Sequence, residues 1–245
     1  ETREGILKHC SVARAATLGD LGERFIERRQ PSLEAQIANV ADEIAYNHHD
    51  IDDGLRSGIL SLDTVCEHQG FREALDASRA QAPGLAGKRL AYTAIRHMLG
   101  AFVADLIDAS RERLARHAPR CVDEVRGHGD TLVDFSPDMR EDHLRLKRLL
   151  FQRLYYDPSV QRIADQAKAL VTELFDAFMR DPGLLPPGAA PDGTVPGEAR
   201  ARVVSDYIAG MTDRYAQVEH SRIFGSPQLG AGPVLAQDMS GIIFK

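Results

Sequence analysis

One long amphipathic segment, residues 33–57, most constrains what this chain can fold into. An α-helix turns by about 100° per residue, so side chains three and four positions apart share a face. Six apolar side chains fall within about 40° of one direction around such an axis. They are Leu33, Ile37, Val40, Ile44, Ile51 and Leu55. A stripe of this kind is stable only against other apolar surface, so the segment predicts a long helix packed on a core.

The opposite face of the same segment carries acidic and aromatic side chains. Measured from Asp42, the residues Tyr46, His49, Asp50 and Asp53 all lie within about 80° around the axis. Charged helix faces commonly meet solvent, and that interpretation stays open. Tyr46 favours a second one, because a large aromatic ring among carboxylates suits the wall of a pocket, with an apolar face and a polar tip.

The remainder of the chain also predicts helices. The ranges expected to be helical are 12–29, 61–67, 70–79, 88–117, 137–156, 158–180 and 198–222, beside 32–57 itself. Residues 181–197 are rich in proline and glycine and predict a surface connector. Residues 131–135 fit either a short extended piece or a loop. The fold class predicted is therefore all-α.

Composition bounds the class of partner. The formal charge of −6 opposes nonspecific binding to nucleic acid. A local basic cluster at Arg145, Lys147, Arg148 and Arg153 fits either a solvated helix face or an anion contact, so nucleic-acid binding stays open. No apolar run of about 18 residues is apparent, so no membrane association is expected.

The cysteines indicate a reducing compartment. Cys10, Cys66 and Cys121 are odd in number and far apart, which is typical of reduced thiols and not of a disulfide framework or a zinc motif. A cytoplasmic location is expected.

Two segments carry a family resemblance. The run from Leu33 to Gly54, which reads LEAQIANVADEIAYNHHDIDDG, resembles the segment of bacterial dGTP triphosphohydrolase-like proteins that carries the last metal ligand. These proteins belong to the HD phosphohydrolase superfamily. The run from Asp206 to Ala216, DYIAGMTDRYA, is similar to the family's C-terminal signature. The resemblance covers residues 5 to 224 or so, which is nearly the whole chain.

The resemblance implies a fold and a division of the chain. It implies an HD-superfamily helical bundle whose C-terminal part occupies residues 1–60, followed by an associated helical domain. Residues 61–135 would continue the helices, residues 136–224 would form the phosphohydrolase-associated region with the connector 181–197, and 225–245 would be a tail. Because Glu1 is no initiator methionine, we expect the chain to be the C-terminal portion of a longer enzyme, with the catalytic half upstream.

The resemblance also assigns a metal ligand. In this superfamily a His, a His-Asp pair and a distant Asp hold the metal, and Asp42 matches the distant Asp. The dipeptide His49-Asp50 is literally an HD pair, but its place in the matched segment is two turns beyond the ligand. The implied cofactor is a divalent ion such as Mg²⁺ or Mn²⁺, and no catalytic residue is assigned within this chain.

Substrate contacts are implied at four positions. Tyr46 would pack against a deoxyribose, and Asp50 would accept a hydrogen bond from its 3′-hydroxyl. Tyr155 would form a second wall near the sugar and Arg153 would contact phosphate, although tyrosines on an apolar helix are commonly core residues. One departure is Glu43, where some members carry a lysine that meets phosphate; a carboxylate would repel it.

The implied activity is metal-dependent hydrolysis of deoxynucleoside triphosphates, dGTP-like, to deoxynucleoside and tripolyphosphate. Relatives assemble as hexamers or other rings, so a homo-oligomer is expected. Two alternatives stay open: a helical regulatory or interaction module without catalytic power, and another HD-type phosphodiesterase. Substrate choice separates the HD-type phosphodiesterase from the triphosphohydrolase, because Tyr46 and Asp50 favour a deoxynucleoside triphosphate.

Overall fold

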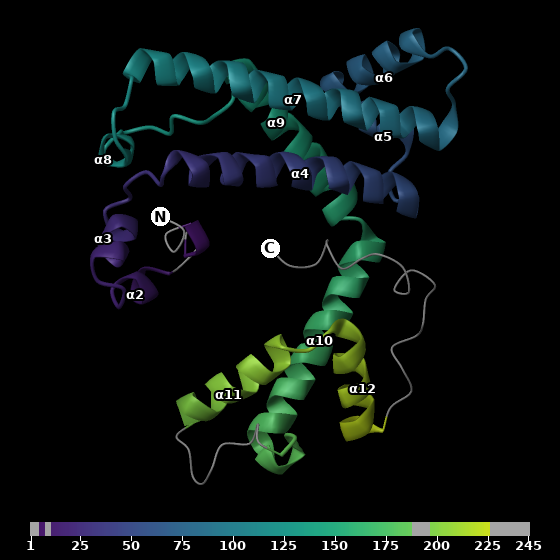
Figure 1. Ribbon diagram of the computed structural model, residues 1–245. Helices are drawn as coiled ribbons and strands as arrows, with labels where there is room; N and C mark the ends of the chain where they lie inside the picture. Colours follow the sequence, from purple (N-terminus) through teal and green to yellow (C-terminus); the bar gives the residue numbers. More distant parts are fainter. Residues whose placement is uncertain (1–4, 8–10, 188–196, 226–245) are drawn as a thin grey trace. The chain divides into compact units, whose positions relative to one another are not determined.

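A computed structural model describes residues 5–7, 11–187 and 197–225 (Figure 1). Within these residues the regular structure is helical and no β-strand occurs, which confirms the all-α prediction. The chain divides into two compact units, Glu1–Leu154 and Tyr155–Lys245. The domain ranges predicted from the sequence stay predictions, and residues 226–245 of the expected tail lie outside the described part.

The first unit is built around two long helices. Its elements in chain order are α2 (Val12–Ala15), α3 (Asp20–Ile26), α4 (Leu33–Ser57), α5 (Leu62–Val65), α6 (Gln69–Gln81), α7 (Gly87–His117), α8 (Val122–Arg126) and α9 (Pro137–Leu150). Helices α4 and α7 run side by side in opposite directions (Figure 1). Helix α6 packs on α7, and α9 packs on α4. The expected single helix over 12–29 is wrong, because residues 16–19 separate α2 from α3 and Gly19 adopts a positive φ of 58°.

Helix α4 begins and ends where its sequence directs. The Ser32 side chain accepts a hydrogen bond from the Ala35 backbone N–H at 3.4 Å, which caps the first turn. Gly58 ends the helix in the left-handed conformation with φ 77°, which a side chain would strain. Val40, Ile44 and Ile51 are buried as predicted. Ile37 is 51% exposed, so the expected apolar stripe is wrong at that position.

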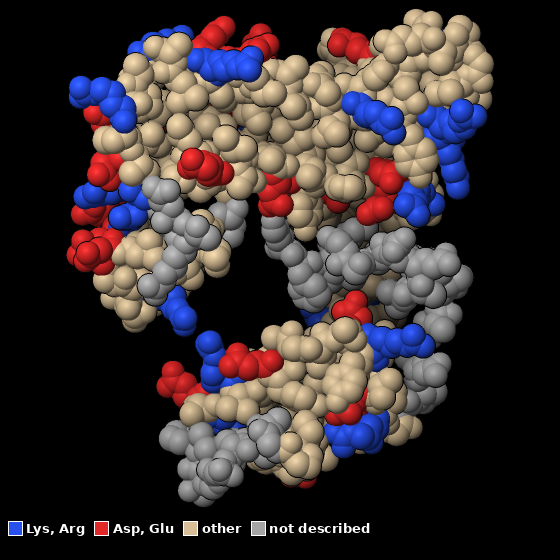
Figure 2. Space-filling model, in the orientation of Figure 1, with Lys and Arg blue, Asp and Glu red and all other residues tan. Residues whose placement is uncertain are grey.

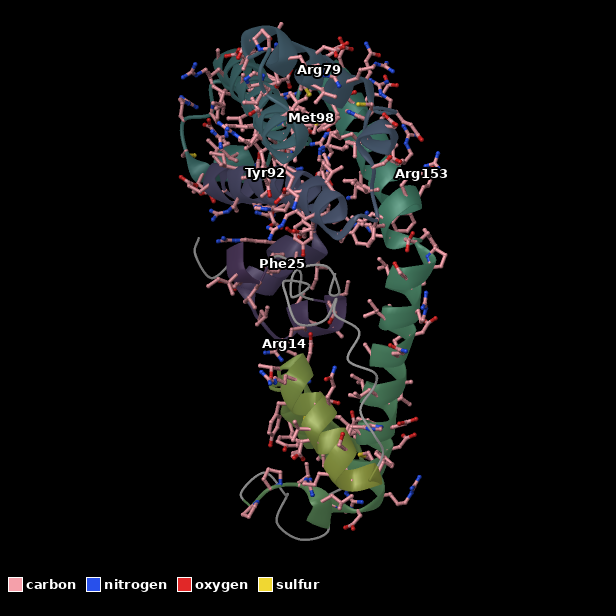
Figure 3. The ribbon with its side chains drawn as sticks, turned by 90° about the vertical axis from the view of Figure 1, so that its right-hand side faces the viewer. Arg14, Phe25, Arg79, Tyr92, Met98 and Arg153 are labelled. Carbon is pink, nitrogen blue, oxygen red and sulfur yellow. The ribbon has the colours of Figure 1, made fainter. Side chains whose placement is uncertain are left out.

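The core of the first unit joins α4, α6, α7 and α9. Its largest fully buried side chains include Phe71, Met98, Phe102, Phe135 and Leu146, and Figure 3 labels Met98 inside this bundle. Each buried side chain of this size contributes about 1.5–3 kcal/mol relative to exposure. Polar side chains share the interior on α4, because its buried face includes Gln36, Asn47, His48 and Asp50.

Helix α7 contains an apolar stretch that was not expected from the sequence. It contains an 18-residue window of mean hydropathy 1.3, long and apolar enough to cross a membrane by length and composition alone, so the expectation of no such segment is wrong. A third of that window, 33%, is buried inside the protein, and core residues such as Met98 and Phe102 belong to this helix. A soluble core helix meets the same criterion. The expectation of no membrane association stays a prediction.

Residues 131–135 form a loop that a single side chain fixes. The Gln36 side-chain oxygen accepts hydrogen bonds from the Leu132 N–H at 2.9 Å, the Val133 N–H at 3.0 Å and the Thr131 hydroxyl at 2.8 Å. These contacts replace the ladder of bonds that a strand would have provided. The segment therefore enters the core, with Leu132 and Val133 buried, without regular structure.

The second unit contains α10 (Pro158–Arg180), η2 (Pro182–Leu184), α11 (Gly197–Ala209) and α12 (Asp213–Phe224). The expected single helix over 198–222 is wrong, because the chain breaks at Gly210 and Thr212 caps α12 by accepting a hydrogen bond from the Tyr215 N–H. The break lets α11 and α12 both pack on α10. Their shared core consists of Leu170, Leu174, Phe178, Leu185, Val204 and Ala216.

Candidate functional site

Asp42, Tyr46 and Asp50 follow one another on α4 at four-residue spacing, so successive side chains lie about 6 Å apart along the axis. Exposure falls along this row. Asp42 is exposed, Tyr46 is half-buried and Asp50 is 4% exposed. The row therefore passes from the surface into the protein, as one side of a ligand site would. Acidic side chains are visible along the α4 edge of the first unit in Figure 2.

Glu43, which directly follows Asp42, is held by helix α9. The Nε2 atom of His143 lies 3.0 Å from Glu43 Oε2, and the His143 side chain is 1% exposed. The Asn47 side-chain amide donates to His143 Nδ1 at 3.4 Å, which leaves the imidazole proton on Nε2, where it is donated to Glu43. The hydrogen bond from His143 holds the pKa of Glu43 below its ordinary value.

Arg140 adds a positive charge to this cluster. Its guanidinium lies 3.5 Å from Glu43 Oε2, forms an ion pair with Asp134, and stacks over the Phe135 ring at 5.1 Å from the centroid. The carboxylate of Glu43 is therefore balanced by a cation and an imidazole hydrogen bond. Its repulsion of a nearby phosphate is weaker than the sequence alone suggests.

His48 is a buried polar residue that the sequence reasoning missed. Its Nδ1–H donates to the Ile44 carbonyl at 2.7 Å, and its ring meets the edge of Phe102 at 5.3 Å between centroids. Its Nε2 atom has no hydrogen-bond partner among the described residues. Burial lowers the pKa of His48 below its ordinary value, so the ring is neutral at pH 7.

The sequence did carry signals for these missed residues. Asn47 and His48 lie about 140° and 240° round the axis from Asp42, nearer to the apolar stripe than to the acidic row. His143 precedes Leu146 and Leu150, which are both buried, by three and seven residues, the spacing of one helix face. What the sequence could not show is that His143 meets Glu43 across 100 residues.

The described residues do not complete the metal site predicted at Asp42. Among the described residues, no group of three or more His, Cys, Asp or Glu side chains is placed to hold a metal ion. Asp42 alone provides one carboxylate, which does not form a metal site. Its role as a ligand stays a prediction, and no chemical step is derived through a metal.

Arg153 lies in a π-helix, η1 (Phe151–Tyr155), which follows α9 directly. The expected α-helix over 137–156 is therefore wrong at its last turn. Arg153 Nη2 lies 3.0 Å from both carboxylate oxygens of Glu67, so an acidic side chain already occupies the predicted phosphate contact. Figure 3 shows Arg153 on the stretch of ribbon that leads from α9 into α10. Widened helical turns of this type occur frequently at functional sites.

Tyr155, the last residue of the π-helix, is the first residue of the second unit. It is half-buried, and its carbonyl accepts a hydrogen bond from the Gln161 side chain at 2.7 Å. It is described with that unit, so its pairing with Tyr46 stays a prediction.

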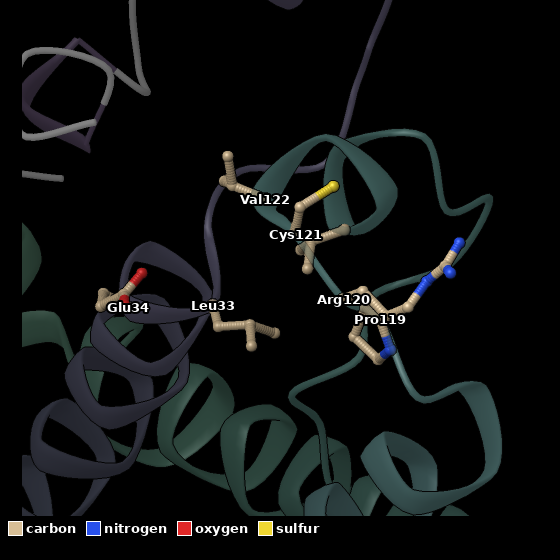
Figure 4. Close-up of a pocket in the computed structure, with 7 residues that line it drawn as sticks. Leu33, Glu34, Pro119, Arg120, Cys121 and Val122 are labelled. Atoms are coloured by element: carbon tan, nitrogen blue, oxygen red, sulfur yellow. The ribbon is translucent and has the colours of Figure 1, made fainter.

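A surface hollow lies at the N-terminal end of α4. Leu33 and Glu34 form one side, and the connection from α7 to α8, with Pro119, Arg120 and Cys121, forms the other (Figure 4). Asp42 is nine residues farther along the helix than Leu33, or about 13 Å at 1.5 Å per residue. The hollow is therefore not part of the row formed by Asp42, Tyr46 and Asp50.

Comparisons with known proteins agree with the fold. Residues 133–222 match the family described as a phosphohydrolase-associated domain. A deoxyguanosinetriphosphate triphosphohydrolase-like protein of Ralstonia pickettii is 50% identical over 224 residues, which are 91% of this chain and 57% of the relative. Proteins of the same name from Thiobacillus denitrificans and Nitrosomonas europaea are 44% identical (94% of this chain, 60% of the relative) and 41% identical (91% and 59%).

The all-α fold and the phosphohydrolase-associated domain agree with the HD phosphohydrolase class. Within that class, the relatives place the chain in the dGTP triphosphohydrolase-like family. The chain spans about three-fifths of the length of the curated relatives it matches. The names of these relatives indicate a hydrolase family.

Proposed function

We propose that this chain is part of a metal-dependent enzyme that hydrolyses deoxynucleoside triphosphates, dGTP-like, to deoxynucleoside and tripolyphosphate. The observation that carries the proposal is the row of Asp42, Tyr46 and Asp50 on one helix, with exposure falling from the first to the last. It occurs in a chain 50% identical to a relative with a triphosphohydrolase-like name.

In this proposal Asp42 is a carboxylate ligand of a divalent ion such as Mg²⁺ or Mn²⁺, in the mixed nitrogen and oxygen environment that suits such ions. When bound, the ion would polarise a phosphoryl oxygen and lower the pKa of a water. The remaining ligands come from outside the residues described. Asp42 contributes its exposed carboxylate at the start of the row.

Tyr46 and Asp50 would orient the sugar. The half-buried ring of Tyr46 offers a flat apolar surface for a deoxyribose, which leaves little space for a 2′-hydroxyl. Asp50 would accept a hydrogen bond from the 3′-hydroxyl. Because Asp50 is 4% exposed, such a bond would be made in a desolvated setting, where a hydrogen bond to a charged group is stronger than at the surface.

The Glu43 carboxylate would repel the phosphates of the substrate unless positive charge lies near it. Arg140 and His143 already balance that carboxylate, so Glu43 is compatible with an anionic substrate at Asp42. Arg153 would contact phosphate after leaving Glu67, and Tyr155 would supply a second wall for the sugar. We also propose a homo-oligomer, a hexamer or another ring, located in the cytoplasm, with no membrane partner. Nucleic-acid binding is left open.

Two alternative functions remain to be separated by experiment. A regulatory or interaction module without catalytic power would release no tripolyphosphate from any nucleotide. Another HD-type phosphodiesterase would cleave phosphodiesters and leave deoxynucleoside triphosphates intact. No described residue favours either alternative over the deoxynucleoside triphosphate, for which Tyr46 and Asp50 are suited.

The test uses the complete gene product incubated with dGTP and Mn²⁺, with tripolyphosphate measured by ion chromatography. We expect release of tripolyphosphate by the wild type and none by Asp42→Asn, with reduced bound metal in that variant. Asp63→Asn removes an exposed carboxylate at the start of α5 and should keep full activity and metal content. Normal turnover by Asp42→Asn would reject the ligand assignment, and absence of tripolyphosphate from the wild type would reject the function.

A further inference from the structure

Two histidines meet where α7 ends. His117 is the last residue of α7, and His128 follows α8 eleven residues later. The Nε2 atom of His128 lies 3.1 Å from the Nδ1 atom of His117. The two rings are nearly perpendicular, at 76°, with centroids 4.4 Å apart. His117 is exposed and His128 is half-buried, so the pair lies at the surface.

A backbone contact favours a proton on Nδ1 of His128. His128 Nδ1 lies 2.7 Å from the Asp130 carbonyl oxygen, which can only accept, so Nδ1–H is the donor. The Asp130 amide nitrogen lies 3.2 Å from the same atom and its N–H would donate to an unprotonated Nδ1, so the two contacts belong to different tautomers, of which the shorter contact favours the one with the proton on Nδ1. The lone pair of Nε2 is left facing His117. Histidine ligands of metals are oriented in this way by a hydrogen bond from the other ring nitrogen.

The separation of the two nitrogens fits a shared ion. Two imidazole nitrogens bound to Zn²⁺ at 2.0–2.1 Å with a tetrahedral angle stand about 3.3 Å apart. The observed 3.1 Å is close to that value. Binding requires the His117 proton to occupy Nε2 instead of Nδ1, and both rings to turn about their side-chain torsions so that the two lone pairs converge on the ion.

The loop that carries His128 is held in place. The Gln30 backbone N–H donates to the Arg126 carbonyl at 3.1 Å, and the Gln30 side chain donates to the Gly129 carbonyl at 3.4 Å. His117 itself lies at the C-terminal end of a 31-residue helix, where the partial negative charge of the helix dipole favours a cation. The backbone of the loop that carries His128 is therefore held in place without an ion.

We propose that His117 and His128 form a two-histidine site for a divalent transition-metal ion of the imidazole-preferring kind, of which Zn²⁺ is the probe. Among the described residues no third His, Cys, Asp or Glu joins them in a metal-binding group, so water fills the other coordination positions. An ion there would tie the end of α7 to the loop after α8. The proposal does not depend on the proposed nucleotide hydrolysis.

The experiment is calorimetric titration of the chain with ZnCl₂, using His117→Gln, His128→Gln and the double variant. We expect one zinc equivalent that weakens at least about ten-fold in each single variant and is absent in the double variant. His97→Gln is the matched control on the same helix, because its ring lies beside Ser78 and not beside another histidine. That control should keep the equivalent.

Thermal unfolding supplies a second measurement. Zinc should raise the Tm of the wild type and of His97→Gln but not that of the double variant, because a ligand that binds only the folded state stabilises it. Zinc binding that is unchanged in the double variant, or no zinc binding by the wild type, would overturn the proposal and leave the two rings as a hydrogen-bonded pair. Circular dichroism confirms that each variant is folded.

Discussion

The buried imidazole of His143 donates a hydrogen bond to Glu43 at 3.0 Å, and so joins α9 to the residue that follows Asp42 on α4. The contact matters for stability because its two partners differ in burial. His143 is 1% exposed, whereas the Glu43 side chain is 45% exposed. Losing the imidazole therefore leaves the Asn47 amide buried without its partner, while losing the carboxylate leaves a group that reaches water.

His143→Ala should lower the free energy of unfolding by about 3 kcal/mol, because it adds a cavity to the loss of one buried and one part-buried hydrogen bond. Glu43→Gln should lower it by less than about 1 kcal/mol, since an amide oxygen can still accept from His143. Urea denaturation followed by circular dichroism measures both values. Equal losses in the two variants would contradict the burial argument.

The pH dependence of the free energy of unfolding should reflect the protonation of His48. Its pKa is lowered in the folded protein, so the unfolded chain binds its proton first as the pH falls. The stabilising contribution is therefore complete above the unfolded pKa of about 6.5 and is lost as the pH falls below that value. We expect the free energy of unfolding to decrease between pH 7 and pH 5, and to decrease less steeply in His48→Leu. A slope unchanged by this substitution would contradict the prediction.

Gln36 should contribute more to the free energy of unfolding than a polar side chain at the surface does. Gln36→Met keeps the shape of the side chain but removes the acceptor of the Leu132 and Val133 N–H groups, which are both buried. A loss of about 3 kcal/mol is expected from two unsatisfied donors. Gln81→Met at the exposed end of α6 is the control and should stay within about 0.5 kcal/mol of the wild type. A small loss in Gln36→Met would show that water replaces the amide.

Substitution of Asp50 can distinguish a role in orienting the substrate from a role in folding. In the complete enzyme, Asp50→Asn should lower kcat/KM for dGTP by roughly ten- to hundred-fold, the equivalent of one hydrogen bond to a charged group. The same variant should lose much less activity toward a 3′-deoxy analogue, which lacks the hydroxyl that Asp50 is proposed to bind. A parallel loss on both substrates would identify Asp50 as a structural residue only, and thermal unfolding of the variant checks this.

Arg153 and Glu67 test whether the guanidinium serves the substrate or only the ion pair. An exposed pair of this type contributes less than about 1 kcal/mol, so both Arg153→Gln and Glu67→Gln should unfold near the wild-type temperature. Arg153→Gln should raise the KM for dGTP, and Glu67→Gln should leave it equal or lower. Equal effects of the two substitutions on KM would assign Arg153 to the ion pair alone.

The helical class and most helix positions follow from the sequence because periodicity and capping are local properties. Helix α4 was predicted within one residue at its start, since Ser32 and Gly58 fix its ends. Breaks inside helices were harder to predict. Gly210 to Thr212 and residues 16–19 interrupt predicted helices because packing favours two short helices, which periodicity does not reveal.

The sequence by itself determined the acidic row of α4 and its opposite apolar face, since both depend only on rotation per residue. The tertiary structure decided which side chains of that helix are buried. It covers Asn47, His48 and Asp50 and leaves Ile37 at 51% exposure. It also joined Glu43 to His143, because that contact depends on where two helices far apart in the chain meet, and His117 to His128, because that contact depends on how the chain turns back after α7.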